Sequence, residues 1–368
     1  MKIAFDHQIF DSQEYGGVSR YAYELAVKLA TSCGQKVAII SPVYVNRYLA
    51  SAPAKLNVMG MPVPRLPKTG RFYRSINSVI AWPTVRCFNP NIVHETYYSS
   101  RCIAPKTAKV VLTVYDMIHE KFSDIFPKND RTTRNKKLAV ERADHIICIS
   151  EQTRQDLIEM FGVHPAKISV VHLGVTFVNQ EEFFKEKSPS ARPFLLYVGS
   201  RGGYKNFVGL LEAYAASYKL KKEFDLICFG GGVFTAGEKD MLHRLEIEIG
   251  RVSHIVGDDK LLAGYYKAAS AFVYPSLYEG FGIPPLEAMS FDCPVVCSGV
   301  SSIPEIVGEA AEMFNPYDLH SIRIAIERVV SDDSLRQNLI ARGRERFKVF
   351  SWERCARETL DVYRKVLS

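Results

Sequence analysis

The sequence has no long uncharged apolar run and no paired cysteine motif. No apolar stretch approaches the roughly 18 residues that would indicate a membrane-spanning helix. Asp6 and His7 interrupt the apolar start of the chain, which argues against a cleaved signal peptide. The eight cysteines include no Cys-x-x-Cys pair, which argues against a disulfide framework or a structural zinc site. These absences predict a cytoplasmic protein with reduced thiols.

A glycine-rich dinucleotide motif is also missing. No Gly-x-Gly-x-x-Gly follows the first apolar run, and this absence weakens the interpretation of the chain as a dinucleotide-dependent dehydrogenase. Hydrophobic residues make up 47% of the chain and charged residues 24%, as in ordinary globular proteins, so disorder is not expected. A length of 368 residues predicts about two domains.

Positive charge is concentrated in the first half of the chain. Residues 1–175 hold 23 lysines and arginines against 14 aspartates and glutamates, whereas the remaining residues hold 24 against 26. The asymmetry predicts a basic surface for an anionic partner, with a solvated basic face as the alternative. Since no recognised nucleic-acid motif accompanies the charge, nucleic acid is not the expected partner.

Short apolar runs alternate with amphipathic stretches along the whole chain. The runs in the first half are KIAF, KVAIIS, NIVH, KVVLTVY, HIICIS and KISVVHLG, and those in the second half are FLLYVGS, FDLICFGG, SHIVG, AFVYPS and PVVCS. Runs of this kind are typical of strands in parallel sheets that helices cover on both faces. The sequence therefore predicts an α/β fold with two Rossmann-like domains that face each other across a cleft.

A polar stretch near residues 178–193 predicts a hinge between the two domains. The predicted domains are residues 1–177 and residues 190–351. The last helical pattern, residues 352–368, could cross back and pack on the first domain. Because ligands of such sheets lie at the carboxyl ends of the strands, functional residues are expected in the loops that follow the strands.

The segment YEGFGIPPLEAM carries two carboxylates beside a Gly-Pro turn. A predicted helix begins at its prolines, so Glu279 lies in the preceding loop and Glu287 in the first turns of the helix. The N–H groups of Phe281, Gly282 and Ile283 form an anion site suited to a diphosphate, and carboxylates accept hydrogen bonds from sugar hydroxyls. The segment predicts a ligand with phosphate and polyol parts. The alternative is an ordinary helix start, in which the charge of Glu287 interacts favourably with the helix dipole. This alternative gives Glu279 no role.

The segment LYVGSRGGYKN lies between a predicted strand and a helix that opens near Asn206. Arg201 and Lys205 flank two glycines, so two cations and a helix N-terminus converge at one turn. Charge-assisted hydrogen bonds from such cations are strong. The segment therefore predicts a phosphate-binding turn.

Together these segments resemble motifs of the retaining glycosyltransferases of family four, which have the two-Rossmann GT-B fold. PSLYEGFGIPPLEAM is similar to the family's signature of two glutamates separated by seven residues, and VGSRGGYKN is similar to its phosphate-binding turn. The resemblance implies that Glu279 faces the transferred hexose and that Glu287 holds the nucleotide ribose. It implies that Lys205 and Arg201 bind the phosphates, although Arg201 stands one position later than in many members.

Three further segments follow the family pattern. DHQIFDSQEYGGVSRYAYEL is similar to the N-terminal glycine loop, which implies that Gly17 lies near the donor phosphate; a plain tight turn is the alternative. HIVGDDKLLAGYYKAAS is similar to the base-binding strand and helix, which implies that Val256, Gly257 and Leu262 lie near the nucleobase. In the third, EAMSFDCPVVCS, Asp292 stands where the family usually has glycine.

The segment TVYDMIHE departs from the common family pattern and resembles a bacterial polysaccharide subgroup. Many relatives have a histidine in the position that Tyr115 occupies, whereas this chain offers Asp116 and, three residues later, His119. Either residue is predicted to receive the acceptor proton or to orient the sugar. A purely structural role is the alternative for each.

The resemblance implies a retaining hexosyltransferase that transfers mannose or a related hexose from a nucleotide-diphosphate sugar, with a GDP-sugar favoured. It implies that the domain of residues 1–177 binds the acceptor and that the domain of residues 190–351 binds the nucleotide sugar. The implied acceptor is a lipid-linked saccharide in polysaccharide or O-antigen synthesis. No two aspartates stand two positions apart, so the metal-binding Asp-x-Asp of the other major sugar-transferase fold is missing, and neither a metal nor another cofactor is expected. A UDP-hexose donor, a GT-B sugar-nucleotide epimerase and a catalytically silent sugar-nucleotide-binding subunit are the alternatives.

The segment RLPKTGRFYRSINSVIAW interleaves cations with apolar side chains. Its basic residues are Arg65, Lys68, Arg71 and Arg74, and its apolar residues are Phe72, Tyr73, Ile76, Val79, Ile80 and Trp82. RTTRNKKLAVER adds Arg131, Arg134, Lys136 and Lys137. This composition is typical of an anionic membrane surface site, so we predict peripheral attachment to the inner face of the cell membrane. An amphipathic helix packed on its own core is the alternative.

Overall fold

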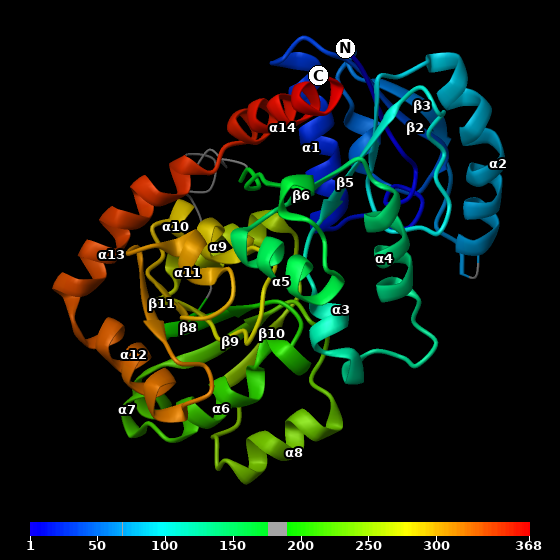
Figure 1. Cartoon of the computed structure of the whole chain (residues 1–368). Helices are drawn as coiled ribbons and strands as arrows, with labels where there is room; N and C mark the ends of the chain where they lie inside the picture. Colours follow the sequence, from blue (N-terminus) through cyan, green and yellow to red (C-terminus); the bar gives the residue numbers. More distant parts are fainter. Residues whose placement is uncertain (68, 176–189) are drawn as a thin grey trace. The chain divides into compact units, whose positions relative to one another are not determined.

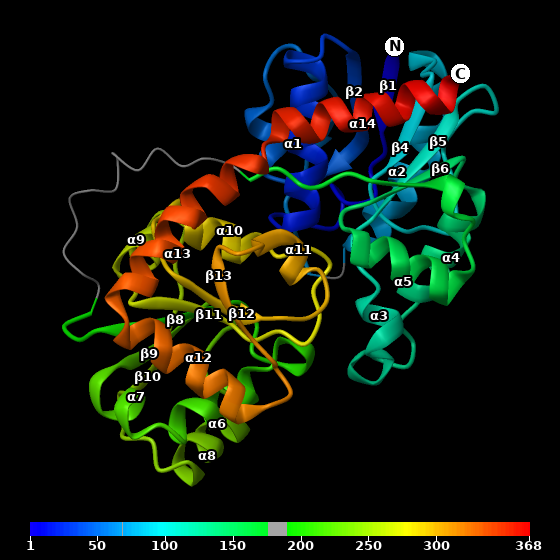
Figure 2. The same ribbon diagram turned by 60° about the vertical axis from the view of Figure 1, so that its left-hand side comes forward.

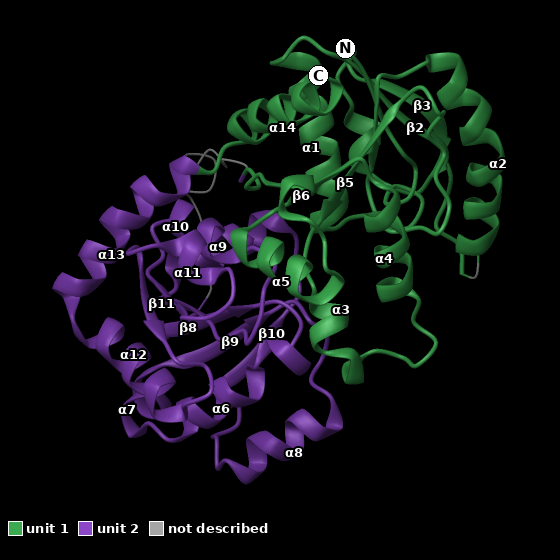
Figure 3. Cartoon of the chain, in the orientation of Figure 1, with its two compact units in different colours: residues 1–174, 350–368 green, residues 175–349 purple. Residues whose placement is uncertain are grey.

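The chain divides into two compact units (Figure 3). Unit 1 comprises residues 1–174 and 350–368, and unit 2 comprises residues 175–349. The computed structural model describes residues 1–67, 69–175 and 190–368. Lys68 and most of the predicted hinge, including the predicted domain limit at residue 177, lie outside the described residues.

Unit 1 is built on a seven-stranded parallel sheet with the strand order β3-β2-β1-β4-β5-β6-β7 (Figures 1 and 2). Its strands are β1 Lys2–Phe5, β2 Lys36–Tyr44, β3 Asn57–Pro62, β4 Ile92–Glu95, β5 Lys109–Val114, β6 His145–Cys148 and β7 Ile168–Val170. Ile3, Ala4 and Phe5 of β1 are all fully buried. A strand whose successive residues are all buried must be covered on both faces, because neighbouring side chains point to opposite sides of the sheet.

The helices of unit 1 supply this cover. They are α1 Gly17–Thr31, α2 Gly70–Phe88, α3 Ile118–Lys121, α4 Thr132–Arg142, α5 Glu151–Phe161 and α14 Trp352–Leu367. α1 buries Tyr21, Leu25 and Leu29 on one stripe. The C-terminal helix α14 lies alongside α1 (Figures 1 and 2). The hydroxyl of Tyr363 in α14 is 2.5 Å from Nδ1 of His94 in β4, so α14 is joined to the sheet by a buried hydrogen bond.

Unit 2 is built on a six-stranded parallel sheet with the order β10-β9-β8-β11-β12-β13. Its strands are β8 Phe194–Val198, β9 Asp225–Phe229, β10 Val252–Ile255, β11 Ala271–Tyr274, β12 Val295–Ser298 and β13 Ala311–Phe314. Its helices are α6 Phe207–Ala215, α7 Tyr218–Glu223, α8 Ala236–Arg244, α9 Asp259–Ala268, α10 Ile283–Ser290, α11 Ile303–Val307, α12 Leu319–Ser331 and α13 Asp333–Arg346. α6 and α12 pack together on one face of the sheet, where their apolar side chains form the core of the unit.

Each sheet has a point where the chain leaves two neighbouring strands in opposite directions. In unit 1 this switch point lies between β1 and β4, and in unit 2 it lies between β8 and β11. The loops that follow these strands diverge and leave a crevice at the carboxyl ends, which is where parallel α/β sheets bind ligands. The loops after β1, β4, β8 and β11 are therefore where functional residues are expected.

The predicted α/β fold with two parallel sheets is confirmed. Each predicted apolar run forms a strand, whereas β3 and β13 were not predicted from the sequence. Their sequences are NVMGMP and AEMF, and each strand lies at an edge of its sheet and is partly exposed. Among the described residues, no helix is both long enough and apolar enough to cross a bilayer.

The prediction that Lys136 belongs to a basic surface is wrong. Its side chain is fully buried, with Nζ 2.6 Å from Oε2 of Glu120 and 2.8 Å from the carbonyl oxygen of Asp116. A buried ammonium group needs such partners, because leaving water without them would cost it far more free energy. Lys136 therefore ties α4 to α3 and adds nothing to the charge of the surface.

Candidate active site

Lys205 and Glu279 meet at the switch point of unit 2. A glycine turn and the short 3-10 helix Gly203–Lys205 follow β8, and the loop that carries Glu279 follows β11. Lys205 Nζ lies 2.7 Å from Glu279 Oε1. The lysine side chain is 18% exposed and the glutamate side chain 10% exposed, so the ion pair is largely enclosed. The structure thus brings together two of the residues that the sequence singled out.

Two serines hold the backbone around Glu279. Ser301 Oγ donates to the Glu279 carbonyl oxygen at 2.8 Å and accepts from the Glu279 N–H at 3.2 Å. Ser302 Oγ lies 2.9 Å from the same carbonyl oxygen and 2.8 Å from that of Phe281. Both serines follow β12, which pairs with β11. The loop that carries Glu279 is therefore fixed from the neighbouring strand.

Tyr274, the last residue of β11, hydrogen-bonds to the Glu279 side chain. Burial, followed by the charge of Glu279, raises the pKa of Tyr274 well above its usual value, so its hydroxyl keeps the proton that it can donate. Lys205 Nζ lies 5.6 Å from the centroid of the Tyr274 ring and 5.2 Å from that of Tyr204. The Glu279 side chain is thus positioned by donors from the loop after β8 and from β11.

The helix α10 begins in the same loop as Glu279. Gly282 precedes it with a φ of 123°, a conformation that other residues rarely adopt, and Ile283 is its first residue. Pro284 and Pro285 have no N–H, so the N–H groups of Gly282 and Ile283 are the ones that form a candidate anion site at this helix start. Glu287 lies one turn further on, where the Tyr266 hydroxyl is 3.4 Å from its Oε2.

Arg201 lies in the loop after β8, but its guanidinium faces protein groups. Nε donates to Glu238 Oε1 at 2.7 Å. The terminal nitrogens donate to the carbonyl oxygens of Gly230, Gly232 and Val233 at 3.1, 2.8 and 3.1 Å. The side chain is 3% exposed. Arg201 therefore braces the glycine loop after β9, and any contact with phosphate would come in addition to these four bonds.

The residues predicted to lie near the base surround the carboxyl end of β10, at one edge of the sheet. Val256 and Gly257 follow the strand, and Leu262 lies in the first turn of α9. Val256 is 67% exposed. A Cβ atom on Gly257 would lie 2.4 Å from Cδ2 of Leu261, so a larger residue there would displace that side chain. The carboxyl end of β10 is thus exposed at Val256, and the base-binding role of these residues stays a prediction.

The remaining predicted residues belong to unit 1 and have local partners. Asp116 Oδ1 accepts from the N–H of Ile118 at the start of α3, at 3.0 Å. His119 stacks on Phe126 with ring centroids 3.9 Å apart. Both Asp116 and His119 are partly exposed. Gly17 is the first residue of α1, and no atom lies within 4 Å of the position that a Cβ would take.

The sequence did not identify three polar side chains of this region. Tyr274 and Ser301 position Glu279, and the only sequence signals for them were a strand end and a serine pair. Ser276, in the loop after β11, is 1% exposed, and its hydroxyl has no partner among the described residues. A buried hydroxyl without a partner is uncommon, and a bound ligand could supply one.

The assembled groups suit a ligand that carries both phosphate and hydroxyl groups. Lys205 and the start of α10 offer positive charge, and Glu279 and Glu287 offer acceptors for hydroxyls. Within the described ranges, no three side chains of the metal-binding types lie together.

Comparison with protein families gives a match over almost the whole chain. Residues 15–177 match the model described as Glycosyltransferase Family 4, and residues 178–346 match the model described as Glycosyl transferases group 1.

Individual proteins agree with the family models. The chain is 32% identical over 276 residues to O-antigen chain mannosyltransferase B of Escherichia coli, and the match covers 70% of each protein. It is 26% identical over 321 residues to O-antigen chain mannosyltransferase RfbU of Salmonella typhimurium, covering 83% of this chain and 86% of the relative. Its structure superposes on that of sucrose-phosphate synthase from Thermosynechococcus elongatus with a TM-score of 0.74 at 21% identity, over 99% of this chain and 98% of the other. The chain belongs to the group 1, family four glycosyltransferases and has their GT-B fold.

Proposed function

We propose that the protein is a retaining mannosyltransferase that transfers mannose from GDP-mannose to a lipid-linked saccharide acceptor in polysaccharide or O-antigen synthesis. The observation that carries the proposal is the enclosed Lys205–Glu279 pair at the switch point of unit 2, beside the start of α10. The names of two relatives, both O-antigen mannosyltransferases, support the choice of mannose and of the pathway.

In this proposal the diphosphate lies against Lys205 and the N–H groups of Gly282 and Ile283. Preorganised positive charge at a leaving group is usually the largest catalytic contribution. As the diphosphate departs, the sugar gains positive charge beside Glu279, and the acceptor hydroxyl attacks from the same face, which retains the configuration. Glu287 holds the ribose, and Asp116 and His119 are the candidates for handling the acceptor proton.

We further propose that no divalent cation takes part, since Lys205 and the start of α10 already offer positive charge to the diphosphate. Turnover in excess EDTA tests this point. Unchanged turnover is expected, and a strict requirement for manganese or magnesium would overturn the metal-free mechanism.

Donor hydrolysis and nucleotide binding test the function itself. The protein is expected to release mannose slowly from GDP-mannose in water and to bind GDP more tightly than UDP in calorimetry. Preference for UDP would change the donor to a UDP-hexose, and interconversion of sugar nucleotides without release would indicate an epimerase. Binding without any turnover would indicate a silent subunit. The anomeric configuration of the transfer product, read by NMR, tests retention.

The helix α2 supports a place at the membrane surface. Phe72, Val79 and Trp82 are 63%, 73% and 45% exposed on this helix, and Arg71 and Arg74 are exposed beside them. Apolar side chains flanked by cations suit an anionic membrane surface. We therefore propose that the protein works in the cytoplasm, attached to the inner face of the cell membrane through α2.

Vesicle sedimentation tests the attachment. The wild-type protein is expected to bind anionic vesicles, but not neutral ones, and to be released by salt. The double variant Phe72→Ser, Val79→Ser should bind less, whereas Val208→Ser, which changes an exposed valine of unit 2, is the matched control. If the wild-type protein binds neither vesicle type at low salt, the proposed attachment to the membrane is wrong.

A further inference from the structure

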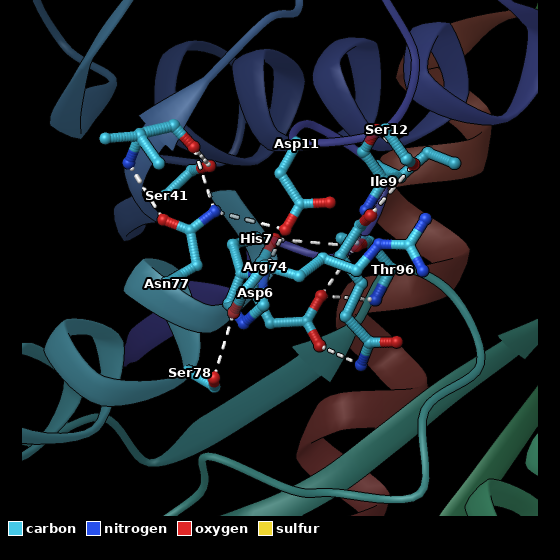
Figure 4. Close-up of polar contacts among 12 residues, drawn as sticks. Asp6, His7, Ile9, Asp11, Ser12, Ser41, Arg74, Asn77, Ser78 and Thr96 are labelled. Carbon is cyan, nitrogen blue, oxygen red and sulfur yellow. Dashed lines mark hydrogen bonds and ion pairs between the residues drawn. The ribbon is translucent and has the colours of Figure 1, made fainter. Parts of the chain in front are cut away.

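A cavity of about 740 Å³ lies at the switch point of unit 1, where the proposed function has its acceptor. The loops after β1 and β4 line it, together with residues of α2 and the start of α4. His7 and Asp11 form a hydrogen-bonded pair at its wall, with Nδ1 of His7 2.8 Å from Oδ2 of Asp11 (Figure 4). Asp116 and His119, the candidates for handling the acceptor proton, do not line the cavity. Their position relative to its walls depends on the groups that hold their segment.

This segment, residues 115–122, follows β5 and includes α3, and we call it the β5–α3 segment. Tyr115, its first residue, is 6% exposed, and its hydroxyl donates to the carbonyl oxygen of Thr96 at 3.0 Å. Burial raises the pKa of Tyr115 well above its usual value, so its hydroxyl keeps the proton and does not act as a base. The side chains of Asp116 and His119 are partly exposed, so a ligand can reach the carboxylate and the imidazole.

Lys136 of α4 holds the β5–α3 segment by two hydrogen bonds. Its side chain is fully buried, and Nζ donates to the carbonyl oxygen of Asp116 at 2.8 Å and to Oε2 of Glu120 at 2.6 Å. Nζ also lies 4.0 Å from Oδ1 of Asp116, and that oxygen accepts from the N–H of Ile118 at 3.0 Å. One ammonium group thus binds the backbone of Asp116 and the side chain of α3 at the same time.

The same lysine joins the β5–α3 segment to the wall of the cavity. Asn135, which precedes Lys136 in α4, lines the cavity, and so does Tyr98 in the loop after β4. Lys136 Nζ lies 5.2 Å from the centroid of the Tyr98 ring, and an ammonium group is attracted to an aromatic face. The Tyr98 hydroxyl accepts from the N–H of Tyr115 at 3.2 Å. A displacement of Lys136 would therefore change the distance between Asp116 and the cavity.

A second ion pair fixes the other end of α3. Lys121 Nζ lies 2.7 Å from Oδ1 of Asp156 in α5, and the Asp156 side chain is buried. Gln152 Nε2 donates to the same oxygen at 3.0 Å. Glu120 and Lys121 are neighbours of opposite charge, and they pair with α4 and α5 respectively. Because a single helical turn is not stable by itself, these contacts determine where α3 lies.

A buried ion pair contributes little net stability, because the loss of hydration offsets the attraction between the charges. Oε1 of Glu120 has no partner among the described residues, so this pair is not fully compensated. What Lys136 adds beyond packing is a fixed geometry. We propose that Lys136 is a positioning residue of the transfer reaction, which holds Asp116 where its carboxylate meets the proton of the acceptor. The inference rests on the proposed function, in which Asp116 is a candidate for that task.

Replacement of both partners tests this role without leaving a buried charge unpaired. Lys136→Met alone would leave the Glu120 carboxylate without its counter-charge, and such a variant can fail to fold. The double variant Glu120→Leu, Lys136→Met has no charge at this place, and such replacements are often neutral or stabilising. The midpoint of urea unfolding, followed by the fluorescence of Trp82 and Trp352 in unit 1, is therefore expected at or above the wild-type value.

Amide hydrogen exchange measures the position of the β5–α3 segment without any substrate. In the double variant the carbonyl oxygen of Asp116 loses its donor, so the N–H group of Ile118 should be released more often from the Asp116 carboxylate. The peptide of residues 115–122 is expected to exchange about tenfold faster, read by mass spectrometry. The peptide of β2, Lys36–Tyr44, is the internal control and should exchange as in the wild-type protein.

Mannose release from GDP-mannose measures the consequence for the reaction, since water then takes the place of the acceptor hydroxyl. The double variant is expected to lose about 10- to 100-fold in kcat, because a small misplacement of a reacting group has a large effect on rate. KM for GDP-mannose should not change, since Lys205 and Glu279 belong to unit 2. Lys109→Met, which changes a half-exposed lysine at the other end of β5, is the matched control and should keep both values.

The conservative variant Glu120→Gln separates position from stability. It keeps an oxygen that accepts from Lys136, and it keeps the bond from Lys136 to the carbonyl oxygen of Asp116. The buried lysine loses its counter-charge, so the urea midpoint should fall below that of the double variant. In contrast, kcat should be higher than in the double variant. A purely structural role of Lys136 predicts the reverse order, in which kcat follows stability.

Wild-type kcat in a double variant whose segment exchanges faster would overturn the positioning role. Unchanged exchange of residues 115–122 would show that Lys136 does not fix the segment, and a kcat that follows the urea midpoint would make Lys136 a structural residue only. If the wild-type protein releases no mannose from GDP-mannose, the transferase proposal is wrong. Faster exchange in the double variant would then still support the fixing of Asp116 by Lys136.

Discussion

The two units place their candidate sites at equivalent points of their sheets but fill them with different chemistry. At the switch point of unit 2, Lys205 and Glu279 form an enclosed ion pair. At the switch point of unit 1, Arg74 and Arg101 line a cavity and have no ion pair in the part of the chain that the structure describes. An anionic ligand of unit 2 must therefore share a lysine with a carboxylate, whereas one of unit 1 meets uncompensated charge.

This difference has consequences for how each site responds to its surroundings. Exposed arginines are screened by salt, so ligand binding to the cavity of unit 1 should weaken steeply as ionic strength rises. The enclosed pair of unit 2 is screened less, and its geometry depends on the loops around it. We expect unit 2 to act through fixed, mutually positioned groups.

The largest effect is expected from Glu279→Gln. This change removes the charge that we propose faces the sugar, and it keeps an oxygen that can accept a hydrogen bond from Lys205. By comparison with the removal of a single preorganised group at other active sites, donor hydrolysis should fall by ~10²–10³. Glu312→Gln, which removes a partly exposed glutamate paired with Arg328, is the matched control. If the Glu279→Gln variant turns over the donor almost as fast as the wild-type protein and has the same thermal unfolding curve, the sugar does not bind beside Glu279.

The next effect, on stability, is expected from Arg201→Met. The change keeps an apolar stem but removes the donors to Glu238 and to the glycine loop after β9. Breaking a fully buried ion pair costs about 3–5 kcal/mol. Since the Glu238 side chain is 20% exposed, we expect about 2–3 kcal/mol, measured by chemical denaturation. Unchanged stability together with weaker GDP binding would instead make Arg201 a direct phosphate ligand.

The structure agrees best with the sequence-based predictions where the residues of a site lie in short segments with a recognisable pattern. The meeting of Lys205 and Glu279 could be predicted, because each lies in a loop after a strand at the carboxyl edge of one parallel sheet, whereas their proposed roles stay predictions. The partners of Arg201 could not be predicted, because three of them are backbone carbonyl oxygens of a loop about 30 residues away, and carbonyl groups have no sequence signature.

The cavity of unit 1 could not be predicted from the sequence, because its lining residues lie far apart in the chain. Its walls combine His7 and Asp11 with Arg74 and Arg131, which come from three segments without a shared motif. His7 and Asp11 follow β1, Arg74 lies in α2 between β3 and β4, and Arg131 lies between β5 and β6, so the strand order of the whole sheet brings these segments together. The strands themselves could be predicted, because burial on both faces requires continuous apolar runs.

A smaller effect, on binding, is expected from Lys205→Met. Loss of one charge-assisted hydrogen bond, worth about 1.5–3 kcal/mol, should weaken GDP binding tenfold or more in calorimetry. Lys219→Met, which changes an exposed lysine bonded to Ser331 in the same unit, is the control and should bind GDP as the wild-type protein does. Unchanged affinity in the Lys205 variant would mean that the diphosphate does not lie at this turn.

The smallest effect concerns the pH dependence of unit 1. His94 is fully buried, with Nδ1 2.5 Å from the Tyr363 hydroxyl and Nε2 2.8 Å from Thr113 Oγ1. Burial lowers the pKa of His94 to about 3. Because this value lies below that of the unfolded chain, the neutral ring stabilises the fold fully above pH 6.5. The contribution is lost as the pH falls, by up to about 1.4 kcal/mol per pH unit.

Urea unfolding followed by tryptophan fluorescence measures this slope in unit 1, since Trp82 and Trp352 both belong to that unit. Glu95 acts in the opposite direction: burial, followed by the charge of Asp6, raises its pKa to about 7, so its contribution grows as the pH falls from 7 towards 4.5. The difference between the wild-type protein and His94→Gln isolates the histidine. The variant should be less stable than the wild-type protein at pH 7.5. The difference between their free energies of unfolding should be smaller by about 1 kcal/mol at pH 5.5. If this difference in free energy of unfolding does not change with pH, His94 has the same pKa in the folded and unfolded chains.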